Sequence, residues 1–111
     1  MEVQDYSWIG EEVYILNFEK VFIGAHSCIS QRAFLCGGNH DYNDPTFKYR
    51  NAPITIRHGV WVGAQVFVSP GTIIENNSVI GAGSIVKENI PENFICSGNP
   101  CKPIKKRWVK K

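Results

Sequence analysis

Branched aliphatic residues recur at every sixth position through the C-terminal half of the chain. The series is Ile56, Val62, Val68, Ile74, Ile80 and Val86. A second series of mostly small or β-branched residues follows four positions after each: Val60, Val66, Thr72, Ser78, Ser84 and Ile90. A period of six matches neither the turn of a helix nor the alternation of a long strand. It indicates short strands joined by corners, as in a parallel β-helix.

The N-terminal half has the same pattern, with one irregularity. Its aliphatic positions are Ile9, Ile15, Ile23, Ile29 and Leu35, and the interval from Ile15 to Ile23 is eight, so that turn has two extra residues. Three six-residue units make one triangular coil of about 18 residues. We therefore predict an all-β parallel β-helix of about three to four coils, formed by residues 9–40 and 54–91.

Two segments depart from the repeat. Residues 41–53, DYNDPTFKYRNAP, are rich in turn-forming and aromatic residues, and we predict a loop extruded from one corner, where solenoids commonly carry function. Residues 92–111 contain two prolines and six basic residues. They are predicted to form a C-terminal cap and basic tail. The whole chain, residues 1–111, is expected to be one domain.

Composition narrows the possible classes of protein. The chain has 111 residues, of which 43% are hydrophobic and 20% charged, and its formal net charge is +2. No apolar run approaches the roughly 18 residues of a membrane span, and the acidic N-terminus lacks the profile of a secretory signal. The four cysteines contain no CxxC pair, which favours a reduced protein. We therefore expect a cytoplasmic protein with no membrane span.

Basic residues gather at the C-terminus. Six of the twelve Lys and Arg residues fall in the last ten positions: Lys102, Lys105, Lys106, Arg107, Lys110 and Lys111. Such a tail is compatible with nucleic acid, a membrane surface or a phosphorylated cofactor, or it simply keeps the chain end solvated. We expect no nucleic-acid partner.

His40 is the strongest candidate for chemistry, because it ends the first half of the repeat at the root of the 41–53 loop. An imidazole can accept the proton of a hydroxyl that attacks a carbonyl. The alternative is a polar residue at the base of a loop.

A second candidate site lies along the repeat. Alternation points Trp61 away from the core, because Val62 points inward. Small residues 18 positions apart stack on neighbouring coils, as Gly63 does over Gly81 and Ala64 over Ala82. Such a stripe admits a thin ligand close to the backbone, or serves only tight packing between coils or subunits.

These motifs together resemble the hexapeptide-repeat acyltransferases, and more narrowly the colanic acid, maltose and galactoside type of sugar O-acetyltransferase. The resemblance rests on the segment ISQRAFLCGGNHDYNDPTF, and on PITI, VWVG, VIGAGSIV and GNP in the second half. It covers residues 8–106. It implies a left-handed coil, a homotrimer, and acetyl-CoA bound in a groove between neighbouring coils. The implied activity is acetyl transfer to a sugar hydroxyl in saccharide or polysaccharide metabolism, with no metal.

The resemblance also implies roles for individual residues. His40 is the expected general base, and Trp61 is expected beside the acyl-CoA groove. Lys102 and Lys105 match positions near the 3′-phosphate of CoA. Lys87 stands where the family often has a Thr-Lys pair, and it remains a candidate for a phosphate contact.

The expected acceptor contacts are Asn17, Asp41 and Tyr42. Asn17 falls in the irregular turn, where the family commonly has a polar residue facing the substrate. Asp41 and Tyr42 flank His40 and are placed either to orient it or to hold sugar hydroxyls, although an Asp at the start of a loop is also ordinary turn chemistry.

Two other functions compete with this interpretation. The γ-class carbonic anhydrases share the coil and bind zinc through three histidines, and this chain has three, His26, His40 and His58. Their spacing lacks the close histidine pair of that class. The other alternative is a catalytically inactive β-solenoid that mediates assembly, which needs neither a histidine at the loop root nor a groove.

Overall fold

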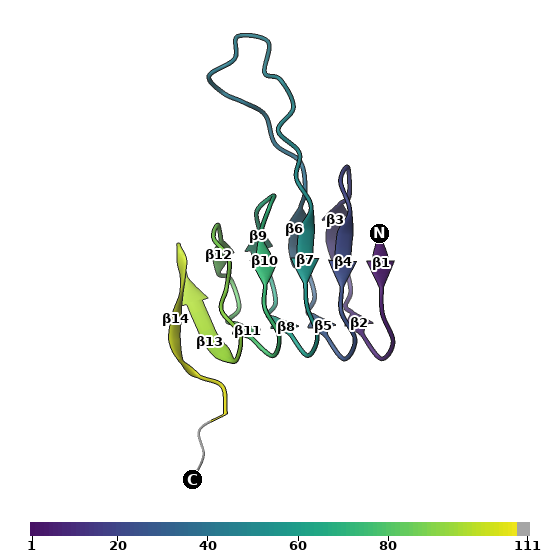
Figure 1. The fold of residues 1–111 in the computed structure, drawn as a ribbon, viewed down its shortest axis with the longest axis vertical. Helices are drawn as coiled ribbons and strands as arrows, with labels where there is room; N and C mark the ends of the chain where they lie inside the picture. Colours follow the sequence, from purple (N-terminus) through teal and green to yellow (C-terminus); the bar gives the residue numbers. More distant parts are fainter. Residues whose placement is uncertain (109–111) are drawn as a thin grey trace.

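Short strands wind around a common axis and form the three faces of a triangular prism (Figure 1). The computed structural model describes residues 1–108, and that range contains no helix. Sheet A contains β1 (Glu2–Val3), β4 (Val21–Ile23), β7 (Ile54–Ile56) and β10 (Ile73–Ile74). Sheet B contains β2 (Trp8–Ile9), β5 (Cys28–Ile29), β8 (Trp61–Val62), β11 (Val79–Ile80), β13 (Phe94–Gly98) and β14 (Cys101–Lys106). Sheet C contains β3 (Tyr14–Leu16), β6 (Phe34–Cys36), β9 (Phe67–Val68) and β12 (Ile85–Val86).

One strand from each sheet makes one coil, so β1–β12 form four coils. Equivalent strands of neighbouring coils pair in parallel, and Ile23, Ile56 and Ile74 are therefore direct neighbours in sheet A. The predicted fold class, an all-β left-handed parallel β-helix, is confirmed. We name the corners by the sheets that they join: AB, BC and CA.

The six-residue series fills the interior of the prism. Its members from Ile56 to Val86 are at most 1% exposed. The residues four positions later close the corners and are equally buried, including Thr72, Ser78 and Ser84. The buried hydroxyls are satisfied by hydrogen bonds, as in the bond from Ser27 Oγ to the Arg57 carbonyl oxygen at 2.8 Å. Ile9 and Ile15 are only half-buried, because the first coil has a neighbour on one side alone.

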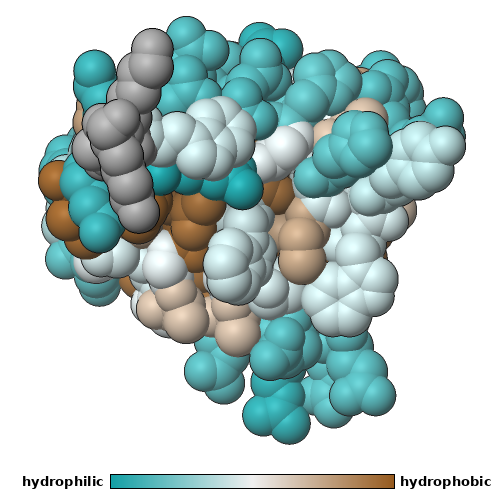
Figure 2. All heavy atoms as spheres, turned by 90° about the horizontal axis from the view of Figure 1, so that it is seen from below, coloured by the Kyte–Doolittle hydropathy of each residue, from teal (hydrophilic) through white to brown (hydrophobic). Residues whose placement is uncertain are grey.

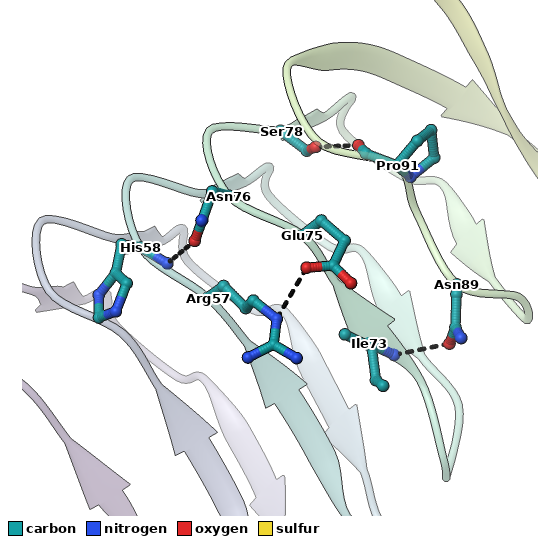
Figure 3. A network of polar contacts seen from close by, with 8 residues as sticks. All are labelled: Arg57, His58, Ile73, Glu75, Asn76, Ser78, Asn89 and Pro91. Atoms are coloured by element: carbon teal, nitrogen blue, oxygen red, sulfur yellow. Dashed lines mark hydrogen bonds and ion pairs between the residues drawn. The ribbon is translucent and has the colours of Figure 1, made fainter.

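Polar side chains at successive coils hold the stack together near the AB corner (Figure 3). The Arg57 guanidinium contacts the Glu75 carboxylate of the next coil at 2.7 Å. The Asn76 side chain accepts a hydrogen bond from the backbone N–H of His58 at 3.0 Å. The backbone of the corner residue Asn77 is left-handed, with φ of 64°, a conformation that Asn tolerates better than most residues. The corners are thus built from local geometry and from contacts between coils.

Extra residues are inserted into the repeat at two places in the residues described, and both insertions lie at the CA corner. Two extra residues follow β3, in the turn 17–20. The longer segment, residues 37–53, follows β6 on the next coil and extends far beyond the prism (Figure 1). Successive coils therefore place both irregular segments at the same corner.

The C-terminal segment continues sheet B before it turns back. Ile95 of β13 pairs in parallel with Val79, and β14 then runs antiparallel to β13. Coil-like pairing thus extends past residue 91, because Cys96 occupies the inward position and is fully buried. Arg107 follows β14 and donates hydrogen bonds to the carbonyl oxygens of Gly59 and Asn77 at the AB corner. The tail residues Lys110 and Lys111 lie outside the described residues.

Candidate active site

His40 lies at the root of the 37–53 loop, where the two arms of the loop come together. It forms an antiparallel bridge with Tyr49, and the two rings are 5.0 Å apart between centroids. Its Nδ1 atom is 2.6 Å from the carbonyl oxygen of Phe47. A carbonyl oxygen only accepts, so Nδ1 carries the proton of the neutral ring and Nε2 carries the lone pair. The loop thus holds an imidazole in the tautomer that can act as a base.

A hollow of about 320 Å³ opens beside His40 at the CA corner. It is lined by Leu16, Phe18, Gly38, Asn39, His40, Tyr49 and Asn51. The Oδ1 atom of Asn51 accepts a hydrogen bond from the Asn39 backbone N–H at 3.1 Å, and Asn39 Oδ1 accepts one from the His40 backbone N–H at 2.8 Å. These bonds fix the backbone that leads into His40 and tie it to the returning arm of the loop.

The expected acceptor residues lie around this hollow without lining it. Asp41 Oδ1 accepts from the Asn43 backbone N–H at 3.0 Å, so its carboxylate stabilises the loop turn and is not bonded to the imidazole. Tyr42 is 80% exposed. Asn17 is exposed between Leu16 and Phe18, both of which line the hollow. Of the two roles considered for Asp41, the structure shows neither a bond to the imidazole nor a place in the lining of the hollow, and the imidazole is bonded instead to the Phe47 carbonyl.

Sequence reasoning missed Phe18, Phe47, Tyr49 and Asn51. The composition of the 41–53 loop gave no sign of which residue would face His40, because the return path of the loop depends on its folded contacts. For Phe18 a signal was present in the interrupted repeat, which marked its turn as irregular.

A second hollow, of about 340 Å³, lies on sheet B at the BC corner. It brings together five residues of the predicted cofactor groove: Trp61, Gly63, Ala64, Gly81 and Ala82, with Ser30, Gln31, Val79 and Ile80. Figure 2 looks onto this face, where brown and white side chains gather between teal margins. We call this hollow the BC groove.

Trp61 forms one wall of the BC groove. Its ring is half-exposed, and Nε1 donates a hydrogen bond of 2.8 Å to Ser30 Oγ on the neighbouring coil. Ser30 is itself buried, at 7% exposure. A buried partner fixes the orientation of an exposed ring, so the wall of the groove is preformed.

The glycines of the groove are required by packing between coils. A Cβ at Gly63 would lie 2.6 Å from the Ile80 carbonyl oxygen and 2.8 Å from the Ala82 nitrogen. At Gly81 it would lie 3.0 Å from the Ser97 Cβ. Ala82 differs, because its side chain is exposed in the groove. The stripe therefore serves coil packing at Gly63, and it also leaves a shallow surface beside Trp61.

The three lysines predicted to contact the phosphates of CoA lie in two different places. Lys105 pairs with Ile95, which continues the cross-strand row of Trp61 and Val79 on sheet B. Lys102 pairs with Ser97 on the same β14 edge, and its amino group contacts Glu88 at 3.1 Å. Lys87 follows β12 at the CA corner, so it does not line the BC groove of its own chain.

A larger hollow of about 410 Å³ adjoins the groove farther along the BC corner. It is lined mainly by charged and amide side chains, among them the exposed Arg32–Glu12 ion pair at 3.2 Å. It contains one residue of the predicted site, Ala64. Its size alone therefore does not make it the better candidate.

The histidines do not converge on a common point. His26 stacks on Tyr6 at 5.1 Å, and His58 Nδ1 accepts from the Ala25 backbone N–H at 2.9 Å. Residues 1–108 contain no group of three His, Cys, Asp or Glu side chains arranged to hold a metal ion. No helix in this range is long and apolar enough to cross a membrane.

The chain is similar to known transferases over most of its length. Residues 53–88 match the family described as bacterial transferase hexapeptide (six repeats). WcaF of Escherichia coli K12, to which an acetyltransferase role in colanic acid biosynthesis is provisionally assigned, is 41% identical over 103 residues. That match covers 93% of this chain and 57% of WcaF, so the chain spans little more than half of this relative.

Solved structures show the same fold. A hexapeptide-repeat acetyltransferase from Vibrio cholerae superposes with a TM-score of 0.90 at 25% identity, covering 96% of this chain and 62% of that one. A galactoside acetyltransferase in complex with coenzyme A gives a TM-score of 0.81 at 28% identity, covering 96% and 64%. Residues 53–88 thus match the hexapeptide-repeat transferase family, within a fold that the chain shares with these acetyltransferase structures.

Proposed function

We propose that the chain is an O-acetyltransferase that moves the acetyl group of acetyl-CoA to a sugar hydroxyl. The observation that carries this proposal is the held imidazole, with Nδ1 bonded to the Phe47 carbonyl and His40 lining a hollow of about 320 Å³. The similarity to WcaF and to the CoA-bound galactoside acetyltransferase supports the choice of donor and acceptor. The names of these relatives also support a setting in saccharide or polysaccharide metabolism.

In the proposed reaction His40 is the general base. Nε2 accepts the proton of the sugar hydroxyl as that oxygen attacks the acetyl carbonyl carbon. The new C–O bond forms, the C–S bond breaks, and the proton passes from the imidazolium to the sulfur of departing CoA. The Phe47 carbonyl oxygen stabilises the imidazolium, because it accepts a bond from a ring that has become positively charged. No acyl-enzyme is required.

The BC groove is the proposed site for the pantetheine arm of acetyl-CoA. The preformed Trp61 wall and the exposed Ala82 flank a shallow apolar surface. From β8 to β14 there are three strand spacings, or about 14 Å. In this proposal Lys102 and Lys105 lie beyond the lining of the groove, along the same sheet, where an ammonium group suits the phosphates of CoA.

The proposed enzyme is a homotrimer whose active sites lie between subunits. His40 lies at the CA corner and the BC groove at another corner of the same prism. One chain therefore does not bring its own base to its own donor site. A ring of three parallel prisms brings the CA corner of one copy against the BC corner of the next, and this closed symmetry gives three equivalent sites. Lys87, at the CA corner, would then face the groove of the neighbouring copy.

We place the reaction in the cytoplasm, where acetyl-CoA is available. The test is to incubate the 111-residue chain with radiolabelled acetyl-CoA and a panel of methyl pyranosides. We expect labelled sugar ester from the wild type and a loss of about 10²–10⁴-fold in turnover for His40→Ala. Absence of transfer to every pyranoside would overturn the proposed acceptor class. Unchanged turnover in His40→Ala would remove His40 from the mechanism.

A further inference from the structure

The two insertions into the six-residue repeat meet at one place. The turn 17–20 after β3 and the segment 37–53 after β6 belong to neighbouring coils, and both leave the prism at the CA corner. Phe18 from the first, with Leu16 at the end of β3, and Gly38, His40 and Tyr49 from the second line the same hollow. The irregular turn therefore contributes directly to the surroundings of His40.

Phe18 is held in this hollow by Gly38. A Cβ at Gly38 would lie only 2.9 Å from both Cδ2 and Cε2 of the Phe18 ring. The ring thus packs against bare backbone, in a space that any other residue at position 38 would fill. The rest of the ring remains free, because Phe18 is 66% exposed. The ring therefore takes no part in the core and offers an apolar face beside His40.

The opposite side of the hollow is aromatic and polar. Tyr49 packs against the His40 ring at an interplanar angle of 33° and is 73% exposed. The Oδ1 atom of Asn51 already accepts from the Asn39 backbone, which leaves the Asn51 amide NH₂ as a donor. The hollow therefore combines exposed ring faces with a hydrogen-bond donor beside the base.

We propose that Phe18 is a specificity-determining residue that packs against the apolar C–H face of the acceptor's pyranose ring. A pyranose has polar edges and a less polar face, which suits one exposed aromatic face and a few polar groups. Packing on Phe18 directs one edge of the sugar, with its hydroxyl, toward His40 Nε2. The site thereby selects cyclic sugars over acyclic polyols. This inference rests on the proposed transfer to a sugar hydroxyl.

The test compares Phe18→Ala and Phe18→Tyr with the wild type, using methyl β-D-galactopyranoside and methyl α-D-glucopyranoside as acceptors. We expect Phe18→Ala to lower kcat/KM for the better acceptor about 10-fold or more, because the ring's apolar contact is lost. Phe18→Tyr keeps the ring face and should stay within about 2-fold. The KM for acetyl-CoA should not change in either variant.

Tyr6→Asn is the matched control. Tyr6 is 82% exposed on the same first coil, but it lies at the AB corner, stacked on His26. Asn also tolerates its left-handed backbone, with φ of 60°. We expect this variant to retain wild-type kcat/KM for the acceptor, which shows that losing an exposed ring elsewhere on the coil has no such effect.

The outcomes separate this inference from the proposed function. If the wild type acetylates neither these nor any other pyranoside, the proposed function fails. If the wild type is active and Phe18→Ala keeps its kcat/KM for the acceptor, only the role of Phe18 is overturned. The role of Phe18 would also be overturned if the KM for acetyl-CoA in Phe18→Ala rose by the same factor as the loss of kcat/KM for the acceptor, since that result would show general damage to the fold. In the His40→Ala background, nuclear magnetic resonance titration should show weaker pyranoside binding when Phe18→Ala is added.

Discussion

The Nδ1 atom of His40 and the carbonyl oxygen of Phe47 are 2.6 Å apart, across a loop that separates them by seven residues. This contact decides which ring nitrogen is free, and it depends on the backbone of Phe47. That backbone is left-handed, with φ of 52°, and its N–H donates to the Asp44 carbonyl oxygen at 2.9 Å. The orientation of the imidazole therefore depends on an unusual backbone conformation seven residues away.

Phe47→Pro should lower kcat about 10-fold or more while leaving the KM for acetyl-CoA unchanged. Proline holds φ near −65° and has no N–H, so it is incompatible with both features of this position. The carbonyl then moves away from Nδ1 and the imidazole loses its preferred tautomer. Steady-state kinetics of acetyl transfer measure the effect. Phe47→Asn is the matched control, because Asn accepts positive φ, and its kcat should remain near the wild-type value. Equal kcat in the Pro variant would contradict the role of the Phe47 carbonyl.

Ser30→Ala should weaken acetyl-CoA binding about 3- to 10-fold without lowering kcat. The substitution removes the acceptor for Trp61 Nε1, so the ring is no longer held as the wall of the BC groove. Isothermal titration with CoA measures the change in Kd. Trp61→Ala should have a larger effect, since it removes the wall itself. If Ser30→Ala and Trp61→Ala both bind CoA like the wild type, CoA does not bind in this groove.

The sequence predicted the coil and the BC groove because both follow from a fixed period. Ile56 and Ile74 point inward at the same place in successive coils, and the same spacing stacks Gly63 on Gly81. Where a repeat fixes the position of one residue, it fixes the positions of all its equivalents. The neighbour of Trp61 on the following coil, Val79, could therefore be predicted from residue numbers alone, whereas its partner Ser30 on the preceding coil could not, because the long loop intervenes.

The residues around His40 could not be predicted from the period of the repeat. Asp41 was one candidate for orienting the imidazole because it is adjacent in sequence, yet its carboxylate accepts a hydrogen bond from the Asn43 backbone. Phe47 reaches His40 only because the loop folds back on itself. Outside the repeat, neighbours are set by contacts specific to one loop, and no periodic rule applies to them. The sequence also did not predict that β13 continues sheet B, because the spacing of the inward residues near Pro91 departs from six.

Ile74→Ala should destabilise the chain by about 2–5 kcal/mol, whereas Ile73→Ala should cost clearly less. The two residues are adjacent in β10, but Ile74 is fully buried inside the prism and Ile73 points outward and is only partly buried. Truncating a buried Ile leaves a cavity in addition to the lost burial. Urea denaturation followed by circular dichroism measures both costs. Equal costs, or a larger cost at Ile73, would contradict the inward assignment of the six-residue series.

The thiol of Cys96 should make stability depend on pH above 9. Burial raises the pKa of Cys96 from 9.0 to about 11, and the neighbouring Cys101 adds to the rise. Between pH 9 and 11 the unfolded chain loses this proton while the folded chain keeps it, so the free energy of unfolding falls as pH rises. The stability difference between wild type and Cys96→Ala, measured by urea denaturation, should therefore shrink from pH 8 to pH 11. Val86→Ala is the control: it creates a cavity without removing an ionisable group, so its cost should stay constant. Parallel pH curves for wild type and Cys96→Ala would show that the buried thiol does not contribute to this dependence.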